Sequence, residues 1–82
     1  MQIPNNLSEI AKIIRADWKN IHYTAKPYLS AMETLDSIND HFFEDSARSI
    51  VCYFLGNAHS WKGETAKAVK QKLNDLLKNT NQ

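Results

Sequence analysis

A chain of 82 residues with 43% hydrophobic and 23% charged side chains has the composition of one folded domain rather than of a disordered segment. Its ten basic and nine acidic residues leave a formal net charge of +1, which excludes a strong overall field for attracting nucleic acid or an acidic membrane. A single cysteine excludes an internal disulfide, and no apolar run approaches the roughly 20 residues of a membrane span. The first residues also lack the basic and apolar parts of a signal peptide, so we expect a cytoplasmic protein.

The first predicted helix covers about residues 7–20, where apolar side chains recur at helical spacing along one face. Asn6 is a good N-cap, and Glu9 stands three residues later, where it can complete a capping box. Asp17 falls on the flank of the apolar stripe rather than opposite it. Its carboxylate either reaches water past its neighbours or is aimed at a partner or a neighbouring helix.

The second predicted helix covers about residues 25–38. Thr24 can cap it, and Pro27 is tolerated in its first turn because the N–H groups there have no partner within the helix. The NDHFFED segment that follows mixes acidic side chains with Phe42 and Phe43. We expect a loop here, with both phenylalanines folded back over the core.

The third predicted helix, about residues 45–58, is the one around which we expect the rest of the chain to pack, with Asp45 as its cap. It is apolar on nearly all sides, which is typical of a helix with neighbours in several directions. Cys52, in its middle, is interpreted as a small buried hydrophobe rather than a reactive thiol. Because no stretch alternates with the two-residue period of a strand, the sequence predicts an all-α fold, a compact single-domain four-helix bundle with this helix central.

The fourth predicted helix, about residues 61–78, follows almost directly, with Ser60 as its cap. Two helices joined by a very short turn, the second with basic residues outside, resemble a helix-turn-helix. This pattern supports an alternative function, DNA binding, through one set of residues: Lys62, Thr65, Lys67, Lys70, Asn74 and Lys78. The nearly neutral charge of the chain argues against this alternative.

No motif in the sequence is typical of an enzyme or a metal site. His22, His41 and His59 stand apart and have no cysteine or acidic partners at zinc-ligand spacing. The chain contains two glycines, too few for a phosphate-binding loop, and a small helical domain has little room for a catalytic pocket. We therefore expect a protein that is not an enzyme and uses no cofactor or metal.

Eight aromatic residues are more than a domain of this size can hide completely. Tyrosine and tryptophan at a surface are the residue types that anchor protein interfaces. We therefore expect a protein partner, bound by exposed aromatic and polar side chains: Arg15, Lys19, Tyr23, Tyr53, Trp61 and Lys62. The other option for the partner is a second copy of the chain, which would make a homodimer through the side of the third helix around Cys52 and Tyr53.

Four blocks of the sequence, IRADWKNI, KPYLSAM, SIVCYFLGNA and WKGETAKAVKQKL, resemble those of small helical proteins carried by phages, plasmids and integrative elements of Gram-positive bacteria. The likeness covers most of the chain, although HFFED replaces the glycine-containing turn expected before the third helix. The resemblance brings no assigned activity and no site residue. It implies a mobile-element setting, in which small non-enzymatic domains bind host or phage proteins, and an inhibitor of a host defence nuclease belongs to that class.

Overall fold

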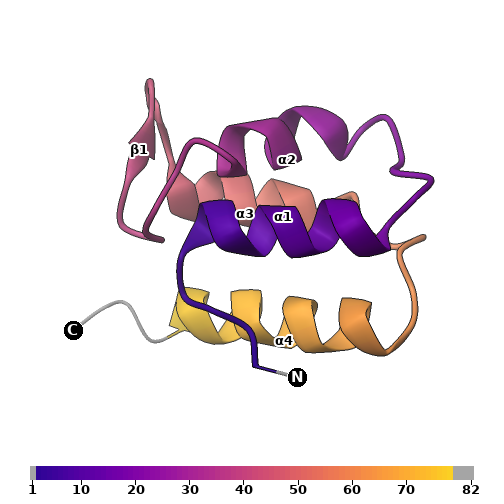
Figure 1. The fold of residues 1–82 in the computed structure, drawn as a ribbon. Coiled ribbons are helices and arrows are strands. Elements are labelled where there is room, and N and C mark those ends of the chain that lie inside the picture. The colour runs from indigo at the N-terminus through magenta and orange to yellow at the C-terminus, as the bar shows by residue number, and fades with distance from the viewer. Residues whose placement is uncertain (1, 79–82) are drawn as a thin grey trace.

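The computed structural model describes residues 2–78, and this part of the chain is mostly helical, as predicted. Its elements are α1 (Leu7–Asp17), α2 (Lys26–Met32), β1 (His41–Phe42), β2 (Asp45–Ser46), α3 (Ala47–Gly56) and α4 (Glu64–Lys78). Successive helices run in alternating directions, with α2 above α1 and α4 below it (Figure 1). Within the described residues, each helix is too short or too polar to cross a lipid bilayer.

One hydrophobic core lies between the four helices. Its fully buried larger side chains come from every helix: Leu7, Ile10 and Ile14 of α1, Leu29 and Met32 of α2, Val51 and Phe54 of α3, and Val69 and Leu73 of α4. No polar or charged residue between positions 2 and 78 is buried. Burial of apolar surface therefore holds this fold together, and its polar chemistry lies at the surface.

Helix α1 begins as predicted, because the Asn6 side chain accepts a hydrogen bond from the Glu9 N–H at 3.0 Å. It ends at Asp17 rather than near residue 20. Trp18 adopts an extended backbone, with φ −92° and ψ 93°, and its side chain is buried. The chain therefore leaves the helix where a large ring turns into the core.

Helix α2 is much shorter than the predicted range of 25–38, and Thr24 does not cap it, since the N-cap is Ala25. The reason for the early end is a tertiary contact with α1. The carbonyl groups of Leu35 and Asp36 accept hydrogen bonds from the Ser8 and Leu7 N–H groups, at 2.8 and 3.1 Å. The Leu7 and Ser8 N–H groups belong to the first turn of α1 and have no acceptor within that helix. The segment after α2 therefore caps α1 and does not continue as part of α2.

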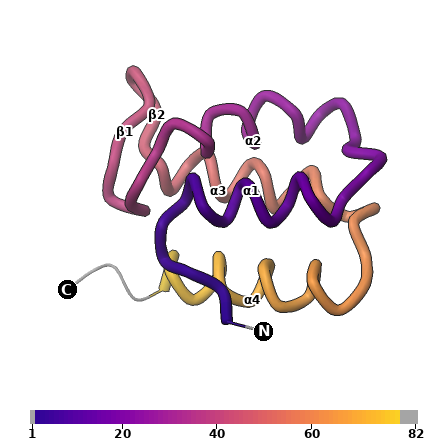
Figure 2. Tube along the Cα trace, in the orientation of Figure 1, coloured from indigo at the N-terminus to yellow at the C-terminus, as the bar shows by residue number. Residues whose placement is uncertain are grey.

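The segment predicted as a loop forms a two-stranded antiparallel hairpin, in which His41 pairs with Ser46 and Phe42 with Asp45. The hairpin lies at the end of the molecule opposite the connection between α1 and α2 (Figure 2). Phe42 packs against the core as expected, but Phe43, at the turn, is 88% exposed. Asp45 is not the cap of α3.

The cap of α3 is Ser46, whose Oγ accepts a hydrogen bond from the Ser49 N–H at 3.1 Å. The prediction that α3 is surrounded on nearly all sides was wrong. Its buried residues, Ala47, Ile50, Val51 and Phe54, belong to the core, whereas Cys52 and Tyr53 are exposed, so the interpretation of Cys52 as a buried hydrophobe was also wrong. Among residues 2–78, the Tyr28 ring of α2 covers Tyr53 in part, and Cys52 remains exposed.

The connection between α3 and α4 spans residues 57–63 and is longer than predicted, so α4 begins at Glu64 rather than near residue 61. Trp61 is part of this connection and is only 2% exposed. Gly63, with φ +111°, turns the chain into α4. Ser60 therefore does not cap α4, because residues 61–63, which include the buried Trp61, lie between Ser60 and the first residue of the helix.

Candidate protein-interaction surface

A hollow of about 480 Å³ lies between α2, α3 and the hairpin. Its lining, which we call the aromatic groove, consists of Pro27, Tyr28, Ala31, Phe42, Asp45, Ile50 and Tyr53. The rings of Tyr28 and Tyr53 stack on each other, with centroids 5.4 Å apart and planes inclined by 22°. The groove is therefore a mostly apolar cavity with one carboxylate in its wall, and its ring stack fixes two of the side chains in place.

Helical geometry explains how the groove forms. Tyr53 directly precedes the buried Phe54, and one step of about 100° along the helix turns its ring out of the core. Ile50 lies three residues earlier and therefore on the same side of α3. Close packing of α2 against α3 then brings Tyr28 beside Tyr53.

Phe43 extends the aromatic surface beyond the groove. Its ring meets the Phe42 ring edge to face, with centroids 4.7 Å apart and planes at 83°. Phe43 also has a φ of +56°, in the left-handed region that favours glycine. This conformation costs a bulky residue about 1–2 kcal/mol. A strained backbone that presents a nearly fully exposed ring in water is a feature found at binding surfaces.

Trp61 is not a surface residue, contrary to its predicted role in partner binding. Its ring stacks on Trp18, with centroids 5.7 Å apart and planes at 11°, and its Nε1–H donates a hydrogen bond to Asp17 Oδ2 at 2.8 Å. Lys70 Nζ donates to the Trp61 carbonyl at 2.7 Å and lies 5.9 Å from the ring centroid. Burial, and secondarily the charge of Lys62, lowers the pKa of Lys70. Trp61 is therefore a structural residue.

The position of Asp17 on the flank of the apolar stripe was the one signal of this arrangement in the sequence. Asp17 is exposed, as a carboxylate that reaches water would be, and it also accepts a hydrogen bond from Trp61, which lies in the connection before α4 rather than on a neighbouring helix or a partner. The spacing of residues along the chain could not identify Trp61 as that donor, since 44 positions separate the two.

The predicted partner-binding residues other than Tyr53 are divided among separate places, and only Lys19, Trp61 and Lys62 share one hollow. Arg15 forms an ion pair with Glu33, and its Nη2 donates to Ser30 Oγ at 3.3 Å. Tyr23 is 76% exposed and stacks on His22 in the connection between α1 and α2. Lys19 and Lys62 line a separate hollow of about 390 Å³, together with Asp17, Trp18 and Trp61. Of the six predicted residues, only Tyr53 lies in the aromatic groove.

The residues of the DNA-binding alternative form no helix-turn-helix. The connection of seven residues before α4 exceeds the three or four residues typical of that motif. Lys70 donates to the Trp61 carbonyl, and the Asn74 amide donates to the Lys70 carbonyl at 2.9 Å. Lys62, Lys67 and Lys78 are exposed, and Thr65 is half-buried. Two of the six side chains are thus already engaged within the protein.

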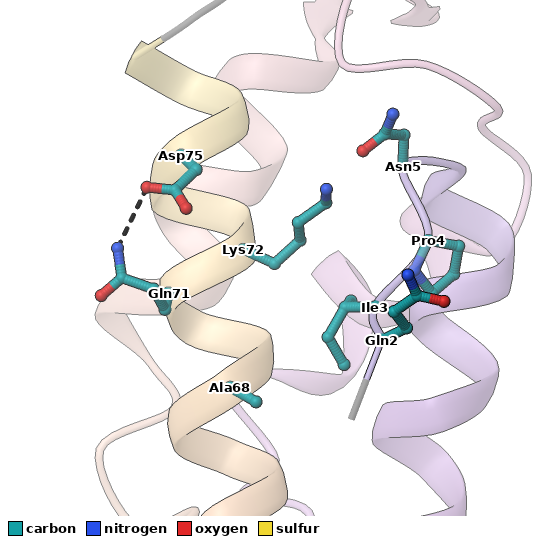
Figure 3. A pocket seen from close by; sticks show the side chains of 8 residues that line it. All are labelled: Gln2, Ile3, Pro4, Asn5, Ala68, Gln71, Lys72 and Asp75. Atoms are coloured by element: carbon teal, nitrogen blue, oxygen red, sulfur yellow. Dashed lines mark hydrogen bonds between the residues drawn. The ribbon is translucent and has the colours of Figure 1, made fainter.

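A hollow larger than the aromatic groove, about 720 Å³, lies between the N-terminal segment and α4 (Figure 3). It is open, and its lining combines three apolar residues, Ile3, Pro4 and Ala68, with five polar or charged ones, Gln2, Asn5, Gln71, Lys72 and Asp75. Gln71 donates a hydrogen bond to Asp75 at 3.0 Å, so this carboxylate already has a partner. The hollow contains no pair of a nucleophile and a base, and the exposed Cys52 lies elsewhere.

Metal binding has no visible site in the described residues 2–78, since no three histidine, cysteine or acidic side chains gather there. His22 contacts Thr24 Oγ1 at 2.7 Å, which is a local turn contact. No protein-family model, curated protein or solved structure matches the chain significantly.

Proposed function

We propose that this protein acts by binding another protein and that the aromatic groove, together with Phe43, is its contact surface. The observation that carries the proposal is the exposure of two large rings, Tyr53 at 59% and Phe43 at 88%, beside an apolar cavity. Such rings bury a large apolar area at a small entropic cost, and they dominate the energetics of many interfaces.

The chemistry of the groove favours binding over catalysis. Its wall offers rings, aliphatic groups and the single carboxylate of Asp45, with no base beside a nucleophile. The scaffold that we propose is a four-helix bundle, in which α3 holds Tyr53 on a rigid element. A preformed surface loses little conformational entropy when a partner binds, which favours affinity.

The partner that we propose is a host or phage protein, in keeping with the resemblance of the sequence blocks to proteins of mobile elements. If this protein covers the active site or the substrate-binding surface of its partner, for example a defence nuclease, it inhibits that partner. A second copy of the chain is the other candidate occupant, because Cys52 and Tyr53 lie exposed on the same helix.

The experiment compares Tyr53→Ala with Tyr23→Ala as a matched control, since Tyr23 is an exposed tyrosine away from the groove. Proteins captured from a host lysate are quantified for each variant, and the dissociation constant of the purified partner is then measured. We expect Tyr53→Ala to weaken binding by about thirtyfold, the effect of an interface hot spot, and Tyr23→Ala to leave it unchanged. Circular dichroism verifies the folding of both variants.

Equal binding by the wild type and Tyr53→Ala would refute the proposed surface. Light scattering of the purified protein distinguishes the two occupants. We expect a monomer, whereas a dimer that Tyr53→Ala dissociates would identify the groove as a self-association site.

A further inference from the structure

Acidic residues are concentrated in the stretch of sequence that provides most of the lining of the aromatic groove, although the chain as a whole is nearly neutral. Residues 27–47 contain no lysine or arginine and five acidic residues: Glu33, Asp36, Asp40, Glu44 and Asp45. The remainder of the chain carries all ten basic residues and four acidic ones. The net charge of +1 therefore conceals two regions of opposite sign, and the hairpin belongs to the negative one.

Three of these five carboxylates are already engaged within the protein. Glu33 pairs with Arg15, and Asp36 Oδ1 accepts a hydrogen bond from Asn6 Nδ2 at 3.3 Å. Asp40 Oδ2 accepts the N–H groups of Asp36 and Ser37, at 2.9 and 3.0 Å. These bonds stabilise structure and leave their acceptors less available to a partner.

Glu44 and Asp45 differ from those three. Within residues 2–78, neither side chain takes part in an ion pair or a hydrogen bond, and both residues are exposed. The nearest arginine in the sequence, Arg48, donates from Nη1 to the Leu77 carbonyl at 3.0 Å and so is held toward α4. Asp45 also lines the aromatic groove with Tyr53. A carboxylate without an internal partner and an exposed ring thus face the same cavity.

We propose that the groove accepts an apolar peptide segment carrying an arginine, whose guanidinium lies on the Tyr53 ring and binds Asp45, with Glu44 adding to the local negative potential. This inference rests on the proposed function and identifies the chemistry of the partner. A guanidinium stacks on aromatic faces and donates paired hydrogen bonds to a carboxylate. The wall of this groove offers both groups, whereas an acidic segment would meet like charge.

The test is a display selection of short random peptides against the immobilised full-length protein. A parallel selection uses the Glu44→Gln/Asp45→Asn variant, and a second uses Glu64→Gln/Asp75→Asn, which removes the same charge outside the groove. Neither substitution in the first variant removes the cap of α3, because Ser46 provides it. Thermal melting followed by circular dichroism establishes that all three proteins are folded.

We expect the wild type and the Glu64→Gln/Asp75→Asn control to enrich peptides that combine apolar residues with arginine. Against Glu44→Gln/Asp45→Asn, the apolar preference should persist while the arginine enrichment disappears. In a synthetic peptide from the wild-type selection, arginine→citrulline should weaken binding about tenfold, and added salt should reduce this difference.

Equal arginine enrichment against all three proteins, or enrichment of acidic peptides, would overturn the inference but leave the groove as a binding site, provided that Tyr53→Ala abolishes binding. Failure of the proposed function has a different signature. In that case no peptide is enriched, or the selected peptides bind Tyr53→Ala as tightly as the wild type.

Discussion

Replacing Asp17 with alanine should lower the free energy of unfolding by about 1–3 kcal/mol, although Asp17 itself is exposed. The substitution removes the acceptor of the Trp61 indole N–H, which lies 2.8 Å away on a side chain that is only 2% exposed. A buried donor that loses its partner keeps the full cost of its desolvation. The magnitude therefore reflects the burial of Trp61, not the exposure of Asp17.

The same substitution should no longer be destabilising when Trp61 is replaced by phenylalanine, which has no N–H group that needs an acceptor. Asp17 is the last residue of α1, where the interaction of a negative charge with the helix dipole lowers the stability of the fold by about 0.3–1 kcal/mol. In the Trp61→Phe background, Asp17→Ala should therefore be neutral or slightly stabilising. The cost of Trp61→Phe itself cancels in the double-mutant cycle.

Urea denaturation of the four proteins, followed by far-ultraviolet circular dichroism, measures this cycle, because the signal does not depend on the tryptophan that is changed. The slope of the unfolding free energy with urea should be the same for all four proteins. An Asp17→Ala cost that is equal in both backgrounds would refute the hydrogen bond as its cause.

Four further predictions concern local conformation, charge and exposure. In urea denaturation, Gly56→Ala should stabilise the protein by up to about 1 kcal/mol, whereas Gly63→Ala should destabilise it by about 1–3 kcal/mol. Both sites have space for a Cβ atom, but only Gly63 has a positive φ. Equal effects of the two substitutions would contradict this reasoning. Phe43→Asn should stabilise the fold by up to about 1 kcal/mol and Phe43→Val should destabilise it, as thermal melting can measure, since asparagine tolerates φ +56° and β-branched valine does not. Hydrogen bonds from the Asp36 and Ser37 N–H groups lower the pKa of Asp40, so the stability that its charge provides should be present above about pH 4 and lost below it. The difference in unfolding free energy between the wild type and Asp40→Asn should therefore shrink on acidification. A difference that stays constant with pH would contradict this. Cys52 should react with a disulfide reagent in the folded protein nearly as fast as in urea, whereas a reaction that requires unfolding would show that the thiol is covered.

The two exposed ring positions at the groove differ in how far the sequence could predict them. Tyr53 was a candidate because it falls beside, and not on, the apolar stripe of its helix, and helical periodicity is a local property. Phe43 was expected to fold over the core, because an aromatic residue in a turn without glycine gives no signal of a hairpin. Its exposure depends on the pairing of His41 with Ser46, which turns Phe43 outward.

The sequence by itself determined the helical character of the chain, the cap at Asn6 and the apolar faces that form the core, because each depends on residues within one or two helical turns. Only the tertiary structure decided which aromatic rings are buried and where charge is left without an internal partner. Trp61 lies in a connection, where no periodicity applies, and it enters the core because Trp18 and Asp17 provide a stacking face and an acceptor. Asp45 and Tyr53 share one cavity only because α3 packs beside α2 and the hairpin, a contact that no local pattern encodes.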